Sequence, residues 1–194
     1  MNIDSKRIVI ISGPSGVGKS TVVAKVLEKS HVPITLSVSA TTRKPRAGEI
    51  DGKNYVFLTH EEFESSRQKG DFLEYKEVFS RGDWYGTLKS TVATGLSGGK
   101  WVLLEIDVEG AISVKSEYPD VLMIFLHPGS MATLEQRLRD RKSDSEDSVK
   151  RRLEVAAREL AQSNQYDHVI ENINVEDTAK QICDVILQKN QTNN

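Results

Sequence analysis

The sequence predicts a three-layer α/β fold in which helices cover both faces of a central parallel sheet. Residues 8–11 (IVII) form an apolar run without alternation, which is typical of a strand buried on both faces. Residues 101–106 (WVLLEI) and 121–126 (VLMIFL) are two further candidates for buried strands. A segment of helical periodicity follows each run, and strands that alternate with helices indicate βαβ units.

The remaining elements of the core follow the same rhythm. Val22, Val23, Val26 and Leu27 have the spacing of a helix after the first strand. Ser143, with Glu146 three residues later, predicts a capping box for a helix that runs through Arg158. Residues 168–170 form a short last strand, Asn174 with Asp177 caps the final helix, and the tail 191–194 is expected to be disordered.

Two segments interrupt this rhythm. Residues 33–97 are rich in Gly, Thr, aromatic and charged residues and predict a small mixed α/β insertion. Residues 139–147 (RDRKSDSED) are a polar break between two helices and a candidate for a mobile lid. We therefore expect one domain over residues 1–194, with a core (1–32, 98–138 and 153–190), an insertion (33–97) and a lid (139–152).

Composition narrows the class of protein. A chain of 194 residues can bury one core with small additions. No run approaches the roughly 18 apolar residues of a membrane-spanning helix, and the polar N-terminus is followed by too short an apolar run for a secretory signal. The net charge of −2 gives no general attraction to nucleic acid. The single cysteine, Cys183, is expected in the core and suits a reducing, cytoplasmic compartment.

The strongest local signal is a phosphate-binding motif between the first strand and the first helix. It comprises Gly13, Pro14, Ser15, Gly16, Val17, Gly18, Lys19 and Ser20, which match G-x-x-x-x-G-K-[ST]. Glycines let backbone N–H groups turn toward phosphate oxygens, and the helix N-terminus adds a favourable dipole. Lys19 supplies a cation for the transferred phosphate, and the Ser20 hydroxyl is a ligand for Mg²⁺. Because GTPases, motors and small-molecule kinases share this loop, it does not identify the reaction.

Further segments narrow the choice among these classes of P-loop protein. Residues 37–49 (SVSATTRKPRAGE) closely resemble the signature of guanylate kinases. The resemblance continues through residues 52–55 (GKNY), 72–75 (FLEY), 84–87 (WYGT) and 104–110 (LEIDVEG) to the arginines around the lid. It covers the chain from about residue 7 to residue 187 in order. The resemblance implies a P-loop kinase fold with a GMP-binding insertion and a helical lid.

Residues of the insertion suit a nucleoside monophosphate. Arg43 and Arg46 can converge on one phosphate through planar guanidinium groups, and Tyr55 and Tyr85 can add hydroxyl donors. The resemblance implies that these four bind the GMP phosphate. It also implies that Glu74 reads the guanine base, with Ser39 and Thr87 as hydroxyl partners. A carboxylate can accept both the N1–H and the N2–H of guanine, whereas adenine would present a lone pair at N1.

The remaining site residues are implied by the resemblance. Arg137 and Arg152 would stabilise the transferring phosphoryl group together with Lys19 and Arg43, while Arg141 and Asn172 would contact ATP. Asp107 ends a core strand between the two substrates and contacts either the guanine side or a metal-bound water. Glu105 is two residues earlier on the same face. Arg139 and Arg151 are interpreted as surface charges.

The predicted activity is transfer of a phosphoryl group from ATP, with Mg²⁺, to GMP and also dGMP, as part of nucleotide recycling. ATP and GMP are the expected partners, without nucleic acid or membrane. Departures from the family pattern are a longer segment at residues 79–85 with Trp84, Lys142 after the lid arginine, and residues 171–173 (ENI). Two rival hypotheses are a non-catalytic guanylate-kinase-like module and a P-loop kinase with another acceptor. The complete P-loop argues against the first, and Glu74 argues against the second.

Overall fold

Within the described residues, 3–78, 82–140 and 146–193, the computed structural model has a central sheet of five parallel strands. In spatial order these are β2 (Ile34–Leu36), β7 (Trp101–Glu105), β1 (Ile8–Ser12), β8 (Leu122–His127) and β9 (His168–Glu171). Every neighbouring pair is parallel. The three apolar runs of the sequence form the three middle strands, which confirms the predicted fold class.

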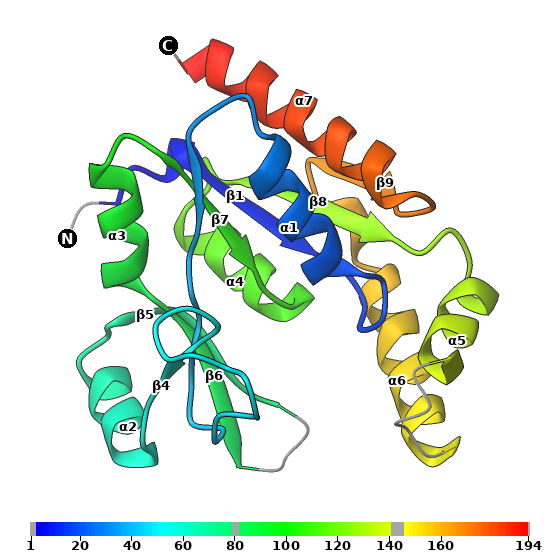
Figure 1. Cartoon of the computed structure of the whole chain (residues 1–194), viewed down its shortest axis with the longest axis horizontal. Coiled ribbons are helices and arrows are strands. Elements are labelled where there is room, and N and C mark those ends of the chain that lie inside the picture. Colours follow the sequence, from blue (N-terminus) through cyan, green and yellow to red (C-terminus); the bar gives the residue numbers. More distant parts are fainter. Residues whose placement is uncertain (1–2, 79–81, 141–145, 194) are drawn as a thin grey trace.

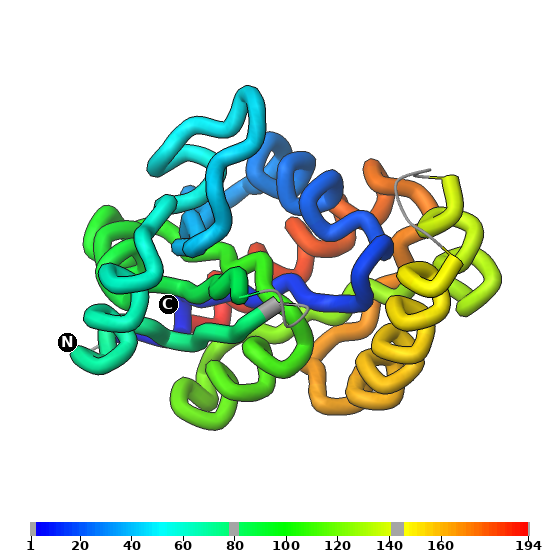
Figure 2. The backbone as a smooth tube through the Cα atoms, turned by 90° about the horizontal axis from the view of Figure 1, so that it is seen from below, coloured from blue at the N-terminus to red at the C-terminus, as the bar shows by residue number. Residues whose placement is uncertain are grey.

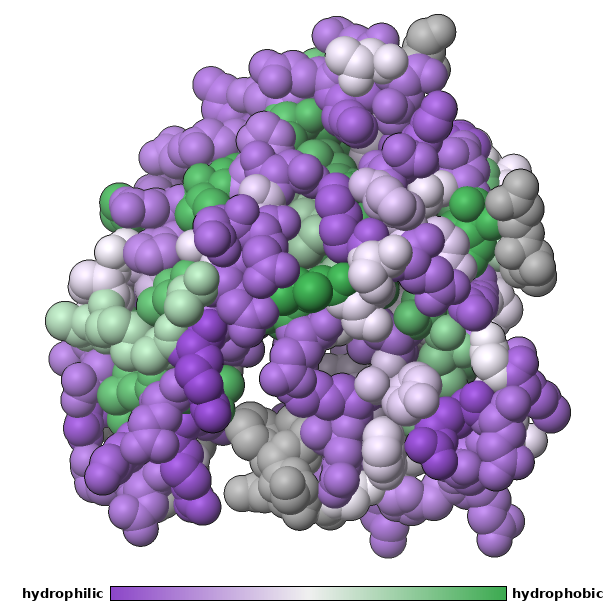
Figure 3. Space-filling model, turned by 180° about the vertical axis from the view of Figure 1, so that it is seen from behind, coloured by the Kyte–Doolittle hydropathy of each residue, from purple (hydrophilic) through white to green (hydrophobic). Residues whose placement is uncertain are grey.

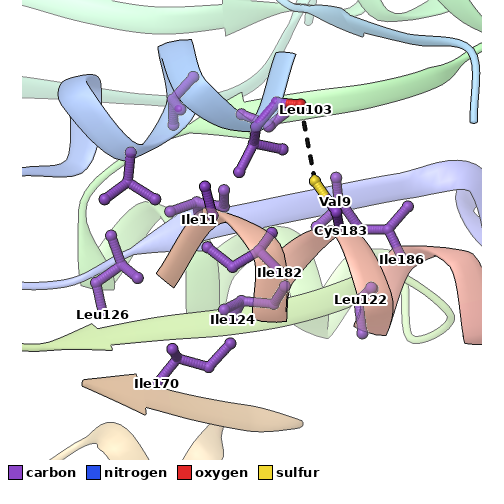
Figure 4. Close-up of a cluster of buried hydrophobic side chains, with 14 of the residues drawn as sticks. Val9, Ile11, Leu103, Leu122, Ile124, Leu126, Ile170, Ile182, Cys183 and Ile186 are labelled. Carbon is purple, nitrogen blue, oxygen red and sulfur yellow. Dashed lines mark hydrogen bonds between the residues drawn. The ribbon is translucent and has the colours of Figure 1, made fainter. Parts of the chain in front are cut away.

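Helices cover both faces of this sheet (Figure 1). The elements involved are α1 (Lys19–Lys29) and α7 (Val175–Asn193) on one face, and α3 (Lys89–Ser97) and α4 (Val108–Glu117) on the other. Alternate residues of β1 serve the two layers, because successive side chains of a strand point to opposite faces. Val9 and Ile11 pack under α7 beside Ile182 and Cys183 (Figure 4), so Cys183 is a core residue as predicted.

The insertion forms a separate sheet with its own small core. Its elements are β3 (Ala40–Thr41), β4 (Val56–Phe57), α2 (His60–Gln68), β5 (Phe72–Val78) and β6 (Asp83–Leu88). The strand order is β4-β3-β6-β5, with β5 and β6 antiparallel. The rings of Phe63 and Phe72 stack with centroids 4.4 Å apart beneath this sheet. The predicted mixed character is thus confirmed.

The sequence places the start of the insertion too early. Strand β2 lies within residues 33–97, yet it pairs with β7 in the central sheet. The last part of that range also serves the core, because Val92 and Leu96 of α3 belong to the apolar cluster beneath the sheet. Strand β2 is short and only partly buried, so it lacks the apolar run that marks the other core strands.

Two helices project from the other side of the core. Helices α5 (Met131–Asp140) and α6 (Glu146–Leu160) pack through Leu134, Leu138, Val149 and Ala156. The predicted cap at Ser143 lies outside the described residues. Helix α6 continues to Leu160, a little beyond the predicted end at Arg158.

The C-terminal helix is longer than the sequence predicts. Asn174 caps α7 as expected, since its Oδ1 atom accepts the N–H groups of Glu176 (2.8 Å) and Asp177 (3.3 Å). The prediction of a disordered tail is wrong through residue 193, because α7 continues to Asn193. The Asn193 amide donates to the Lys6 carbonyl oxygen (2.7 Å) and thereby ties the end of the helix to the N-terminal segment. No helix in the described part of the chain has the length and apolar composition needed to cross a membrane.

Candidate active site

The P-loop joins the end of β1 to the start of α1. Gly13 has a φ of +146°, and a Cβ atom there would lie only 2.4 Å from the carbonyl oxygen of Leu126 on β8. Gly16 adopts a φ of +92°, which glycine reaches without steric cost. The loop therefore needs glycine for close approach to the sheet and for its turn. Its position before a helix N-terminus is that of an anion-binding loop.

The first two residues of α1 contribute polar side chains to this loop. The Lys19 ammonium donates to the carbonyl oxygens of Gly13 (2.6 Å) and Pro14 (3.3 Å). The Ser20 hydroxyl donates to Glu105 Oε1 at 2.6 Å, which links α1 to the end of β7. A cation at a helix N-terminus makes this region attractive to phosphate.

Arginines of helices α5 and α6 and the residue after β9 contact the P-loop as well. Arg137 on α5 donates to the carbonyl oxygens of Val17 (3.2 Å) and Asn172 (2.7 Å). The Asn172 amide donates to the same Val17 oxygen (2.8 Å). Arg152 on α6 lies 3.5 Å from the Ser15 hydroxyl. Arg137, Arg152 and Asn172 therefore all contact the P-loop, whereas Arg141 lies outside the described residues.

Arg43 is the centre of a cluster in the insertion. Its Nε atom donates to the Tyr85 hydroxyl (3.0 Å), and its two terminal nitrogens donate to Glu49 at 2.9 and 3.0 Å. The guanidinium also lies over the ring of Tyr55, 5.3 Å from its centroid. Arg46 is exposed and reaches Glu49 through its backbone N–H (2.7 Å). Three of the four predicted phosphate ligands are thus adjacent, and the Arg46 side chain points outward to solvent.

Charge pairing and burial shift the pKa values of this cluster. The bonds to Glu49 raise the pKa of the Arg43 guanidinium, while Arg43 holds the pKa of the Glu49 carboxyl below its usual range. Burial raises the pKa of the Tyr55 phenol, and the nearby Glu105 carboxylate adds to this effect.

Glu74 lies on β5 directly opposite Thr87 on β6. The Thr87 hydroxyl donates to Glu74 Oε1 at 2.6 Å. Burial, reinforced by the charge of Asp107, raises the pKa of the Glu74 carboxyl to about 7, although the Thr87 hydrogen bond opposes the shift. Ser39 is half-buried just before β3, but its hydroxyl forms no hydrogen bond to Glu74 in this state. Thr87 therefore contacts Glu74 directly, whereas the part that Ser39 would play in contacting the base stays a prediction.

Asp107 follows β7 and caps α4. Its Oδ1 atom accepts the N–H of Gly110 (2.8 Å), and its Oδ2 atom lies 3.0 Å from the Lys76 ammonium. Asp107 is close enough to Glu74 to influence its ionisation, whereas Glu105 contacts Ser20. The two carboxylates at the end of β7 therefore face different parts of the site. Among the described residues, no three His, Cys, Asp or Glu side chains form a cluster that could hold a metal ion.

Several polar residues of the site were missed by the sequence analysis. Glu49 was quoted as part of the signature, but no role was predicted for it. The Ser12 and Tyr166 hydroxyls are buried beside each other, and one Glu159 oxygen is buried without a hydrogen-bond partner among the described residues. The Lys19 and Asp107 charges both influence Glu159, which places this carboxyl near the P-loop. The surroundings of Ser12, Glu159 and Tyr166 depend on contacts distant in sequence, so no local motif marks these three residues.

The P-loop, Asp107 and Asn172 all follow carboxyl ends of parallel strands, where α/β sheets bind ligands. Seen from below in Figure 2, the P-loop lies between the insertion and helices α5 and α6. The space-filling view shows a hollow lined mainly by hydrophilic residues between these two projections (Figure 3). This fold defines a P-loop kinase, a transferase that binds nucleotides.

Comparisons with known proteins give the family. The profile of the guanylate kinase family matches residues 5–189. A guanylate kinase of Rhodopirellula baltica is 54% identical over 96% of this chain and 90% of its own length, and one from Prochlorococcus marinus is 45% identical over 94% and 98%. The crystal structure of the Anaplasma phagocytophilum guanylate kinase superposes with a TM-score of 0.75 at 35% identity, covering 94% of this chain and 85% of that one. The chain belongs to the guanylate kinase family.

Proposed function

We propose that this protein transfers the γ-phosphoryl group of ATP to GMP, and also to dGMP, with release of ADP. The observation that carries the proposal is the buried Glu74 carboxylate, which Thr87 holds on the insertion near the end of β7. A buried carboxylate needs donors to satisfy it. The N1–H and N2–H groups of guanine are two adjacent donors that match its two oxygens.

The GMP phosphate would bind at the Arg43 cluster. Arg43 and Tyr85 are already bonded to each other, and Tyr55 lies against the same guanidinium. These three groups are therefore close enough to contact one anion. Arg46, which is exposed in this state, would turn inward to add a second guanidinium. Glu49 occupies Arg43 now and would have to share it with the incoming phosphate.

ATP would bind along the P-loop, with its phosphates at residues 13–20. Asn172 lies against Val17 at the end of this loop, in a position suited to contact the adenine side. Mg²⁺ would be bound with ATP, because this ion prefers hard oxygen ligands and keeps several waters. The Ser20 hydroxyl and the adjacent Glu105 carboxylate offer such oxygens, and Asp107 is available through a water. When bound, the ion would neutralise charge on the β- and γ-phosphates.

The residues of this chain would act by positioning and by stabilising charge. Lys19 hydrogen-bonds the loop carbonyl oxygens in this structure and would transfer its ammonium to a phosphate oxygen when ATP binds. Arg137 and Arg152 reach the same loop from α5 and α6 and would approach the transferring group when the lid closes. Concentrated positive charge in a water-poor hollow stabilises the developing charge on phosphoryl oxygens. Division of the chain into core, GMP-binding insertion and movable lid belongs to this proposal, as does a cytoplasmic role in GMP recycling.

A coupled assay of ADP release tests the proposal. GMP, dGMP, AMP, CMP and UMP would be compared as acceptors at equal concentration, and GMP should exceed AMP by roughly 10⁴-fold in kcat/KM. The Lys19→Ala variant controls for contaminating kinases and should lose activity by several orders of magnitude while remaining folded by circular dichroism. A preference for another monophosphate would contradict the proposal, and so would a Lys19→Ala variant that is as active as wild type.

A further inference from the structure

Lys76 connects the insertion to the core next to Glu74, whose carboxylate is proposed to bind the guanine base. Its ammonium lies 3.0 Å from Asp107 Oδ2 and 2.7 Å from Glu109 Oε2. Lys76 is two residues after Glu74 on β5, so both side chains project from the same face of the strand. That face packs against the start of α4, which provides Asp107 and Glu109.

Close packing at this contact leaves little freedom for Glu74. Gly110 on α4 lies directly against it, since a Cβ atom at residue 110 would be 3.0 Å from Glu74 Oε2. The backbone N–H of Gly110 is bonded to Asp107, which is bonded in turn to Lys76. Glu74 therefore sits on the surface of α4, and the Lys76 bridge ties its strand to the first turn of that helix.

We propose that Lys76 is a positioning residue that determines base specificity, because it ties β5 to the start of α4 and thereby fixes the Glu74 carboxylate against the guanine edge. This inference rests on the proposed role of Glu74. Two simultaneous hydrogen bonds to guanine require a carboxylate held in one orientation, since small displacements of a binding group weaken both bonds.

The charge of Lys76 matters as well as its contact. Asp107 and Glu109 are two acidic residues near Glu74, and a like charge disfavours ionisation of a buried carboxyl. The Asp107 charge raises the pKa of the Glu74 carboxyl and the Lys76 charge lowers it. Lys76 thus compensates the acidic start of α4 and favours the ionised form of Glu74, which accepts both guanine donors.

The Arg43 cluster lies on other strands, although one of its members neighbours Lys76. Arg43 follows β3, and Tyr85 on β6 is the cross-strand partner of Lys76 but accepts a hydrogen bond from Arg43. Binding of the phosphate of AMP and of GMP should therefore survive loss of Lys76 equally. Only interactions with the base should change.

The test compares Lys76→Met with wild type in steady-state kinetics on GMP and AMP. We expect KM for GMP to rise about tenfold with kcat within about twofold, while kcat/KM for AMP changes by less than about twofold. Lys76→Arg should restore selectivity, because it keeps the charge and the reach. The matched control is Lys89→Met, which removes a lysine 4.0 Å from Glu117 at the other end of α4 and should leave the GMP-to-AMP ratio unchanged.

Two further variants separate this inference from the proposed function. Glu109→Gln weakens the same bridge from α4, so it should lower GMP selectivity in the same direction even if Lys76→Met folds poorly. In a Glu74→Gln background, Lys76→Met should lower the GMP-to-AMP ratio no further. Equal losses on GMP and AMP in Lys76→Met, or a full additional loss in the double variant, would overturn the role of Lys76. Unchanged selectivity in Glu74→Gln alone would instead overturn the proposed role of Glu74.

Discussion

The Glu74 side chain is held in surroundings that oppose its ionisation. The side chain is largely buried beside α4, and the negative charge of Asp107 is nearby. Only the Thr87 hydroxyl and the more distant charge of Lys76 favour its ionised form. These effects raise the pKa of its carboxyl to about 7. The proposed binding site for the base therefore lowers the stability of the folded chain when it is empty.

This cost predicts a pH dependence of stability. The folded chain keeps a proton on Glu74 up to about pH 7, whereas the unfolded chain releases it near the ordinary carboxyl pKa. Between these values the folded state binds more protons, so its stability falls as the pH rises. From pH 5 to pH 8 we expect wild type to lose about 2–3 kcal/mol relative to Glu74→Gln in urea denaturation without nucleotide. Parallel pH curves for the two proteins would contradict this.

At the residue scale, the sequence predicts groups that belong to a local motif better than groups that depend on packing. Gly13, Lys19 and Ser20 are recognisable because strand, loop and helix are contiguous. The pairing of Arg43 with Glu49 joins residues that are close in the chain, yet nothing in that segment assigns the partner. The bridge from Lys76 to Asp107 depends on the insertion packing against α4, which periodicity does not reveal.

At the scale of elements, helices α5 and α6 carry arginines that meet the P-loop. Arg137 hydrogen-bonds the Val17 carbonyl oxygen, and Arg152 lies beside Ser15. Both contact the P-loop, where ATP is proposed to bind, rather than the Arg43 cluster. Their loss should therefore slow phosphoryl transfer more than it weakens binding of the acceptor. Helix α5 also carries Arg139, which pairs with Glu135 and Glu146 and provides a control on the same helix.

We predict that Arg137→Met lowers kcat by about 10²-fold or more, because its charge is needed most in the transition state. The affinity for GMP, measured by equilibrium titration, should change by less than about tenfold. Arg139→Met should stay within about twofold of wild type in both quantities. If Arg137→Met abolished GMP binding with normal turnover at saturation, the arginine would belong to the acceptor site.

Strands β1, β7 and β8 have a strong apolar pattern and were predicted as core strands, whereas β2 has none and was assigned to the insertion. The buried runs of β1, β7 and β8 are evident in the sequence because both faces of each strand are covered. Strand β2 has three partly buried residues, so its place in the core sheet depends on pairing with Trp101 to Leu103 rather than on its own composition. The end of α7 is polar, and its order follows from contacts such as that of Asn193 with the Lys6 carbonyl oxygen.

At the scale of the whole molecule, topology brings distant segments to one edge of the sheet. The P-loop follows β1, Asp107 follows β7 and Asn172 follows β9, and these strands are parallel members of one sheet. The insertion and helices α5 and α6 project from this edge on either side of the P-loop (Figure 1). A donor nucleotide on the core and an acceptor on the insertion would therefore meet over the same loop.

The central claim is that Glu74 selects guanine, both by accepting its paired donors and by rejecting adenine. The most direct measurement is kcat/KM for GMP and AMP with wild type and Glu74→Gln in one buffer. For GMP, kcat/KM should fall by an amount equivalent to about 2–4 kcal/mol of transition-state stabilisation, because the new amide group faces one of the guanine donors. Activity on AMP should stay level or rise, since the same amide can donate to adenine N1. An equal fall in kcat/KM for both substrates would contradict this role. Glu74 would then be structural, and Asp107 would be the next candidate for the residue that recognises the base.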